Sequence, residues 1–196
     1  MRCTTPTYYG TDEEIMEEFL ILKEMIEDAG FMRYEISNFA AAGKASIHNM
    51  VYRNMEPYIG LWLSASSFLP MQNVECRMQK IFINSERWTL NSEFWTRWTN
   101  TWDIKQYIEW NRIDEKEVQS LNESDLLIEE FFLRLRTREG IADISKYIPL
   151  LVPTYELLLE TYKNEWLITF DWIKLRLTDS GMNVYNSIIT DLLQRI

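Results

Sequence analysis

The chain has 196 residues, of which 46% are hydrophobic, and this is enough for a packed core in one domain or in two small ones. Its formal net charge of −10 and its pI near 4.7 oppose non-specific binding to nucleic acid or anionic membranes, because such binding needs clustered Lys and Arg. The two cysteines, Cys3 and Cys76, form neither a CxxC metal motif nor a disulfide framework. No signal peptide opens the sequence and no apolar run is long enough to span a bilayer, so we expect a protein of the reducing cytoplasm without an integral membrane segment.

The first predicted element is a helix that begins at Thr11 and ends before Gly30. Thr11 and Glu14 have the spacing of a capping box. Four apolar residues recur at helical spacing and define one face: Ile15, Phe19, Leu22 and Ile26. Residues 31–37, FMRYEIS, alternate in polarity between Gly and Asn, which is typical of a strand. A helix followed by a strand indicates the end of an α/β unit.

Residues 41–112 form the middle of the chain and mix Gly, Pro, Asn and Trp with short apolar runs such as KIFIN at residues 80–84. This composition predicts loops and short strands. His48, the only histidine of the chain, lies in a polar, glycine-containing segment of this region. We therefore expect it in a loop.

The C-terminal part has helical periodicity again. One helix is predicted after Asn122, with Gly140 as its stop, and a second spans about residues 153–165. Residues 167–178 predict two short strands around Asp171 and Trp172. Apolar faces are expected on the first helix, at Ile128, Phe131, Phe132 and Leu135, and on a last helix, at Met182, Tyr185, Ile188, Ile189 and Leu192.

Helices followed by a hairpin and another helix favour a small winged-helix-like domain, so the predicted fold class is α+β. Many winged helices bind DNA. The last helix, however, carries Asp179 and Asp191 against Arg195 and has no basic or aromatic patch that would follow phosphates. Nucleic acid is therefore not an expected partner.

Several segments carry a resemblance to a known family. Residues 28–68 contain YEISNFA, then a glycine, then the pattern HNxxY and the run IGLWLSAS. Three later segments complete the pattern: RWTNTWDIKQYIE at 97–109, EEFFLRLRTREGI at 129–141 and KLRLTDSGMNVYNSII at 174–189. Together they resemble the HemW-type haem chaperones, which are similar to oxygen-independent coproporphyrinogen III oxidase of the radical SAM family. The resemblance covers nearly the whole chain, and YEISNFA with HN is its most specific part.

The resemblance implies the C-terminal portion of such a protein. Residues 1–40 would be a remnant of the last helix and strand of a partial (β/α) radical SAM barrel. Residues 41–112 would be a loop and short-strand region with the HN motif, and residues 113–196 a C-terminal winged-helix-like helical domain with a β-hairpin wing. The family's CxxxCxxC loop is absent, and Arg53 and Ser66 stand where a Trp and a His are usual. A [4Fe–4S] cluster and S-adenosylmethionine are thus implied only if a separate chain supplies the cluster motif.

The resemblance also implies candidate binding residues. His48 is the candidate haem-iron ligand, because imidazole is a common axial ligand, and Asn49 and Tyr52 are candidates for orienting it. The alternative is a loop histidine with local hydrogen bonds, whose neighbours only cap and pack.

Six further residues are candidates for the side that faces substrate or S-adenosylmethionine: Tyr34, Glu35, Ser37, Asn38, Arg97 and Asn100. The first four lie where the carboxyl end of a barrel strand would face an active site. Arg97 and Asn100 are expected to be structural hydrogen-bonding residues. The alternative is that they contact a haem propionate or the carboxylate of S-adenosylmethionine.

The function implied is that of a truncated or split HemW-like protein. It would bind or deliver haem or porphyrin, or complete a radical SAM barrel whose N-terminal part is another chain. Enzymatic activity stays open, because the chain lacks the Fe–S motif and is expected to be inactive alone. Two alternatives remain, namely a winged-helix-like protein-interaction module without a cofactor and a non-functional gene remnant.

Three tryptophans occupy positions that favour glycine. Trp172 follows Asp171 in the predicted hairpin, where Asp-Gly would suit a type I′ turn, and Trp166 follows a predicted helix at the left-handed C′ position. Trp62 lies in a run that the resemblance marks as glycine-rich. The chain has six glycines against eight tryptophans. Either these are ordinary tryptophans, or some are UGA codons that the source organism reads as glycine.

The cysteine count generates a first prediction. Two distant cysteines cannot supply the three thiolates of a radical SAM cluster, so anaerobic reconstitution with iron and sulfide should give no stable cluster and no cleavage of S-adenosylmethionine. Iron content and absorption spectra measure this directly. Stoichiometric iron with a stable [4Fe–4S] absorption would contradict it.

Overall fold

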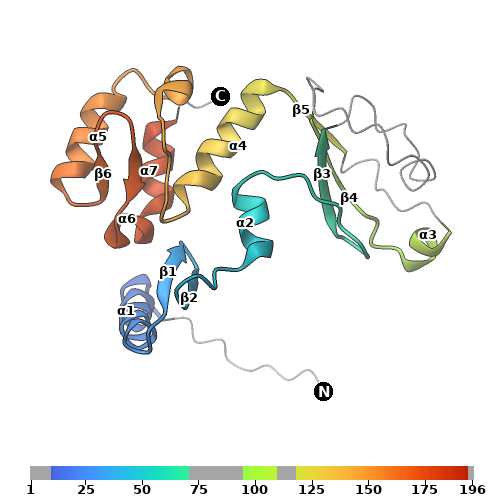
Figure 1. Ribbon diagram of the computed structural model, residues 1–196, viewed down its shortest axis with the longest axis horizontal. Helices are drawn as coiled ribbons and strands as arrows, with labels where there is room; N and C mark the ends of the chain where they lie inside the picture. The colour runs from blue at the N-terminus through green and yellow to red at the C-terminus, as the bar shows by residue number, and fades with distance from the viewer. Residues whose placement is uncertain (1–9, 71–94, 110–117, 194–196) are drawn as a thin grey trace. The chain divides into compact units, whose positions relative to one another are not determined.

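The computed structural model describes residues 10–70, 95–109 and 118–193, in two compact units, residues 1–46 and 47–196 (Figure 1). Helices and small antiparallel sheets make up the described chain, so the predicted mixture of helix and sheet is confirmed. The predicted division at residues 40 and 112 stays a prediction. The two cysteines and the KIFIN segment lie outside the described residues. No helix in the described ranges is both long and apolar enough to cross a membrane.

The smaller unit begins with helix α1 (Asp12–Asp28), which starts at the predicted capping box. The Glu14 amide donates to the Thr11 hydroxyl at 3.3 Å, and the Thr11 amide donates to the Glu14 carboxylate at 2.7 Å. Gly30, with a φ of +86°, follows the end of the helix as predicted. None of the α1 side chains is buried, although the helix has the predicted apolar spacing.

A hairpin follows α1. Strand β1 (Met32–Glu35) lies within the predicted strand and pairs antiparallel with β2 (Asn38–Ala40). The second strand was not predicted, because its three residues are too few for an alternation to be visible.

The larger unit begins with a helix, followed by a three-stranded antiparallel sheet of order β3-β4-β5. Their bounds, with a short helix between β4 and β5, are α2 (Ile47–Arg53), β3 (Ser66–Pro70), β4 (Trp95–Thr99), α3 (Ile104–Ile108) and β5 (Gln119–Leu121).

The loop predicted for the HN motif is wrong. His48 and Asn49 lie in the first turn of α2, a helix of seven residues. At 3.6 residues per turn this is about two turns, so no repeat of apolar residues is long enough to identify the helix from sequence.

The C-terminal part of the larger unit packs helices around a second hairpin, β6–β7 (Figure 1). Its elements are α4 (Glu123–Leu135), the 3₁₀ helix η2 (Ser145–Leu150), α5 (Tyr155–Asn164), β6 (Ile168–Phe170), β7 (Leu175–Leu177), α6 (Asp179–Asn183) and α7 (Tyr185–Leu192). The predicted helices and strands are present. The last predicted helix is two helices, which meet at Val184 (φ −114°).

The main core lies in this C-terminal part. Phe131 and Leu135 of α4 are fully buried, and all five residues of the predicted stripe on α6 and α7 are at most 5% exposed. The Tyr185 hydroxyl donates to the Phe132 carbonyl at 2.9 Å, and burial raises the pKa of Tyr185 to about 12. Tyr185 therefore stays protonated and links α7 to α4.

The β6–β7 hairpin turns between Asp171 and Lys174. The Asp171 carboxylate accepts from the amides of Ile173 at 3.1 Å and Lys174 at 2.7 Å. Trp172 has a φ of +72°, as expected for a glycine position, but Ile173 is not in the left-handed region. The predicted type I′ turn is therefore wrong, since positive φ at the first central residue alone is the pattern of type II′.

The Asp171 carboxylate generates a pH prediction. Hydrogen bonds from the Lys174 and Ile173 amides hold the pKa of Asp171 below its ordinary value of 3.8. A pKa lowered by folding stabilises the protein above the unfolded pKa, and this contribution is lost as the pH falls through the folded pKa. Asp171→Ala should therefore lower the Tm at about pH 7, and the Tm difference from wild type should shrink toward about pH 3. A difference that stays constant over this range would show that the charge is irrelevant.

Candidate functional site

Helix α2 brings together His48 and Tyr52, which are one turn apart. The Tyr52 hydroxyl and His48 Nε2 are 3.1 Å apart, and the two rings meet edge to face with centroids 4.7 Å apart. His48 is exposed and Tyr52 is partly buried. Asn49, on the same helix, makes interactions of its own. The imidazole is thus accessible from solvent and hydrogen-bonded on one nitrogen.

A series of aromatic rings continues from Tyr52 into the sheet. The Tyr52 and Tyr58 centroids are 4.6 Å apart, those of Tyr58 and Phe68 are 6.1 Å apart, and Phe68 stacks on Trp95 at 4.4 Å. Edge-to-face and stacked geometries of this kind are favourable for aromatic pairs. The rings connect the accessible histidine to the buried side of β3 and β4.

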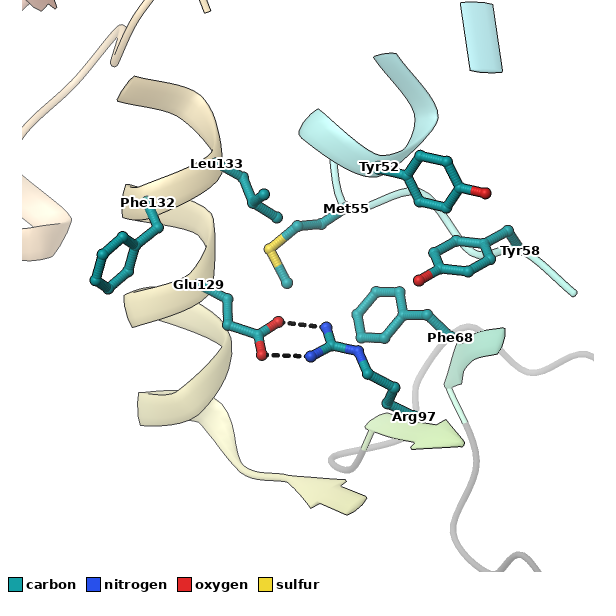
Figure 2. A pocket seen from close by; sticks show the side chains of 8 residues that line it. All are labelled: Tyr52, Met55, Tyr58, Phe68, Arg97, Glu129, Phe132 and Leu133. Atoms are coloured by element: carbon teal, nitrogen blue, oxygen red, sulfur yellow. Dashed lines mark hydrogen bonds and ion pairs between the residues drawn. The ribbon is translucent and has the colours of Figure 1, made fainter. Parts of the chain in front are cut away.

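A cavity of about 350 Å³ lies beside these rings (Figure 2). Figure 2 shows Tyr52, Tyr58 and Phe68 on one side, the helix that carries Glu129 and Leu133 on the other, and Met55 reaching between them. The cavity is lined by Tyr52, Met55, Tyr58, Phe68, Arg97, Glu129, Phe132 and Leu133. It is thus mostly apolar, with one ion pair in its wall.

That ion pair joins β4 to α4. The Arg97 guanidinium donates to the two Glu129 oxygens at 2.7 and 2.5 Å, a bidentate arrangement. The two side chains are 29% and 27% exposed, so the pair is partly shielded from water. The hydrogen bond that Arg97 donates to Glu129 is the largest cause that raises the pKa of Arg97. A propionate or an S-adenosylmethionine carboxylate would have to compete with Glu129 for this guanidinium, and a ligand role of Arg97 stays a prediction.

Asn100 holds the loop between α2 and β3. Its side-chain amide donates to the carbonyls of Gly60 at 3.0 Å and Trp62 at 2.8 Å, and it is 1% exposed. Its Oδ1 has no hydrogen-bond partner among the residues that the structure describes. Asn100 fulfils the structural role expected of it, whereas a ligand contact stays a prediction.

The residues around 34–38 form the β1–β2 hairpin of the smaller unit. Glu35 is fully buried and accepts from the Ser37 amide at 2.9 Å and from the Asn38 side chain. Glu35 thereby closes the hairpin turn. Tyr34 also makes interactions of its own. The expected role of these four residues on the side that faces substrate or S-adenosylmethionine stays a prediction.

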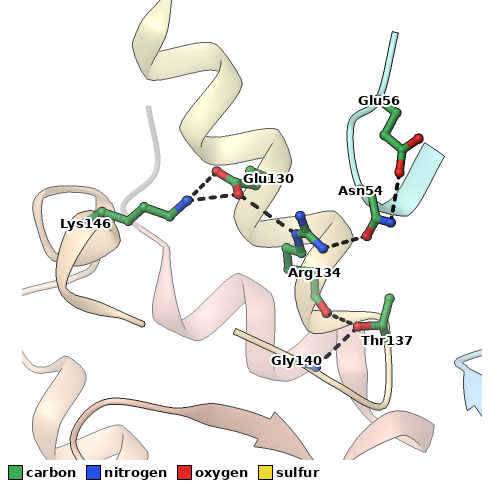
Figure 3. Close-up of polar contacts among 7 residues, drawn as sticks. All are labelled: Asn54, Glu56, Glu130, Arg134, Thr137, Gly140 and Lys146. Carbon is green, nitrogen blue, oxygen red and sulfur yellow. Dashed lines mark hydrogen bonds and ion pairs between the residues drawn. The ribbon is translucent and has the colours of Figure 1, made fainter. Parts of the chain in front are cut away.

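A second polar group holds the segment after α2 against α4 (Figure 3). Arg134 donates to the Asn54 side chain at 2.5 Å and lies 3.9 Å from Glu130, which also binds Lys146 at 2.8 Å. The position of α2 beside the cavity therefore depends on α4. Among the described residues, no three His, Cys, Asp or Glu side chains lie together as a metal site would require.

Sequence reasoning missed Tyr58, Phe68 and Glu129 as neighbours of the predicted residues. The pair of Arg97 and Glu129 spans 32 positions, and no local pattern connects them. Tyr58 and Phe68 lie on either side of the run IGLWLSAS, which the resemblance marks as glycine-rich. Their position beside this run, which contains Gly60, was the one signal in the sequence that could have identified them.

Comparisons with known proteins agree with the resemblance seen in the sequence. No family model matches the chain. The haem chaperone HemW of Lactococcus lactis subsp. lactis is 22% identical over 191 residues, which is 93% of this chain and 43% of that protein. HemW of Synechocystis sp. is 40% identical over 47 residues, which is 24% of this chain and 11% of that protein. The resemblance to HemW-type proteins is confirmed.

The fold of this HemW-like chain also has a solved counterpart. Coproporphyrinogen III oxidase (HemN) from Escherichia coli, a radical SAM enzyme, matches with a TM-score of 0.54 and 11% identity, over 93% of this chain and 41% of that one. At this identity the match concerns the fold alone. The HemW-like chain spans less than half the length of HemN and of the Lactococcus protein.

The bidentate pair generates a prediction on stability. Arg97→Ala and Glu129→Ala should each destabilise the chain, and a double-mutant cycle should give a coupling energy of about 1 to 2 kcal/mol, because the pair is bidentate and partly shielded. Urea unfolding of the four proteins measures it. The matched control is Lys146 and Glu130, whose lysine is 49% exposed and whose coupling should stay at roughly 0.2 to 1 kcal/mol. Equal coupling energies for the two pairs would show that the bidentate pair stabilises the chain no more than the exposed pair does.

Proposed function

We propose that this HemW-like chain binds haem, with His48 as the axial ligand of the iron. The observation that carries the proposal is the position of His48, exposed on α2 at the end of a series of aromatic rings that borders an apolar cavity. Imidazole is a common haem ligand, and aromatic side chains make favourable contacts with a flat, apolar macrocycle. The similarity to proteins named haem chaperones supports the same ligand.

The size of the cavity supports partial rather than complete enclosure of a porphyrin. Its volume of about 350 Å³ lies near the lower end of the range of small-molecule pockets, about 300 to 1,000 Å³. We infer that only an edge of a porphyrin enters this cavity while the rest stays on the surface. Partial exposure suits cargo that is bound and then delivered.

Tyr52 has a defined part in this proposal. Its hydroxyl is hydrogen-bonded to His48 Nε2, the nitrogen that would bind iron, so iron binding replaces this hydrogen bond. The Tyr52 ring stays beside the cavity as an apolar wall. Tyr52 thus orients the imidazole before binding, and its hydroxyl occupies the position beside Nε2 that iron would take.

Completion of a radical SAM protein in trans belongs to the same proposal. The chain spans 43% of the Lactococcus relative, and that similarity includes the YEISNFA segment. We assign residues 1–40 to the tail of a partial barrel and residues 113–196 to a winged-helix-like domain. A cytoplasmic partner chain with CxxxCxxC would supply the cluster and S-adenosylmethionine. Co-purification with such a chain tests this part separately from haem binding.

A hemin titration tests the proposal. The wild-type chain should give a shifted Soret band, and His48→Ala should weaken binding by at least about tenfold, the lower end of what loss of an outer-shell group costs at metal sites. Tyr52→Phe is the matched control on the same helix. It should keep or strengthen binding, because it removes the competing hydroxyl and retains the ring.

A second control addresses adsorption of hemin to apolar surface. Ile47, next to His48, is 83% exposed, and Ile47→Ala should change the affinity little. Equal affinities and unchanged spectra for wild type and His48→Ala would end the proposal. They would instead favour an interaction module without a cofactor.

A further inference from the structure

Five non-glycine residues of the described chain have a left-handed backbone, and three of them are tryptophans. The φ values are +100° at Trp62, +59° at Trp166 and +72° at Trp172. The described ranges contain six tryptophans, so half of them lie in a region that bulky L-residues rarely adopt. All three are positions at which the sequence favoured glycine.

The backbone at Trp166 shows why its φ is positive. The Leu167 amide donates to the Tyr162 carbonyl at 2.9 Å and the Trp166 amide donates to the Lys163 carbonyl at 3.1 Å. This is the Schellman motif, whose C′ residue is left-handed and most often glycine. The end of α1 has the same motif with Gly30 at C′, where the Phe31 amide donates to the Ile26 carbonyl at 3.2 Å. The chain therefore uses glycine for this geometry elsewhere.

The other two positions have equally specific demands. Trp172 is the first central residue of the β6–β7 turn, the position that type II′ turns fill with glycine. Trp62 lies in the loop between α2 and β3, where the Asn100 side chain donates to the carbonyls of Gly60 and of Trp62 itself. At Trp172 the hairpin pairing holds the backbone, and at Trp62 the amide donates to the Tyr107 hydroxyl at 2.7 Å while the carbonyl accepts from Asn100, so the hydrogen bonds at both positions involve main-chain atoms and not the indole.

The three indoles are not buried, so little packing energy offsets the strain of their left-handed backbone. Trp62, Trp166 and Trp172 are 62%, 80% and 59% exposed. The two other left-handed residues differ, because Met55 lines the cavity beside Tyr52 and Ser64 has a small polar side chain. Exposed tryptophans often mark docking surfaces. A docking surface, however, needs an exposed ring and gives no reason for a left-handed backbone at each of three separate turns.

We infer that positions 62, 166 and 172 are glycine in the native protein, encoded by UGA codons that its source organism reads as glycine. The inference distinguishes them from other tryptophans of the chain. Trp98 is 1% exposed in β4, and Trp95 stacks on Phe68. Glycine at position 98 would leave a hole and glycine at position 95 would remove a stacked ring from the sheet, so these two are genuine tryptophans. Trp62 and Trp172 also have ring contacts, with Tyr107 at 5.8 Å and Phe170 at 5.2 Å, but these contacts leave both indoles more than half exposed.

Reading the gene is the direct test. The codons at 62, 166 and 172 should be UGA, whereas those at 95 and 98 should be UGG. UGG at 62, 166 and 172 would overturn the inference. UGA at position 98 would also overturn it, because a codon read as glycine cannot specify that buried indole.

Thermal unfolding gives an independent test on the protein with tryptophan at these positions. Trp166→Gly should raise the Tm by about 2–4 °C, because the left-handed strain is removed. Trp166→Ala should not reproduce this rise, since its Cβ keeps the strain. The matched control is Trp102→Gly, because Trp102 is 78% exposed but its backbone is not left-handed. This change should not raise the Tm. Equal effects of Trp166→Gly and Trp166→Ala, or of Trp166→Gly and Trp102→Gly, would contradict the inference.

Discussion

The arrangement of the larger unit depends on helix α4, because one side of this helix makes apolar contacts and the other side makes polar contacts. On one side, Phe131 and Leu135 are fully buried in the C-terminal core. On the other side, Glu129 holds β4 through a bidentate ion pair and Arg134 holds the segment after α2. The apolar contacts account for most of the stability of such a helix, whereas the polar ones fix which surface lies against it. The candidate haem site therefore takes its geometry from α4, although its proposed ligand lies on α2.

Much of the fold was predictable where the signals are local. Helices α1 and α4 both have a capping box before an apolar repeat, and a left-handed glycine follows each of them, Gly30 directly after the C-cap of α1 and Gly140 a few residues beyond the end of α4. The buried stripe on α6 and α7 was also correct, because the apolar face of these helices packs in the main core, whereas the apolar face of α1 has no buried side chain. The break at Val184 was not predicted, since the stripe continues across it and the spacing alone carries no sign of a new helix.

The site was less predictable, since its features are either short or distant in sequence. Helix α2 has seven residues, too few to reveal a period, and therefore a loop was predicted for the HN motif. The spacing of His48 and Tyr52 is nevertheless that of neighbours on a helix face, and read this way it anticipates their contact. The ion pair of Arg97 with Glu129 joins a strand to a helix, so only tertiary structure reveals it.

The left-handed positions connect the backbone of this chain to its surface chemistry. At Gly30 and at Trp166 the same pair of main-chain hydrogen bonds imposes the same φ region, so conformation there follows the hydrogen bonding and not the residue. Glycine at Trp62, Trp166 and Trp172 would remove three exposed indoles without changing these hydrogen bonds. Exposed indoles are also surfaces on which a planar, apolar ligand such as hemin adsorbs without a specific site. Binding that survives their replacement by glycine and is lost with the His48 imidazole therefore arises from iron ligation on α2, because adsorption to these three indoles is removed and adsorption to other exposed rings does not depend on an imidazole.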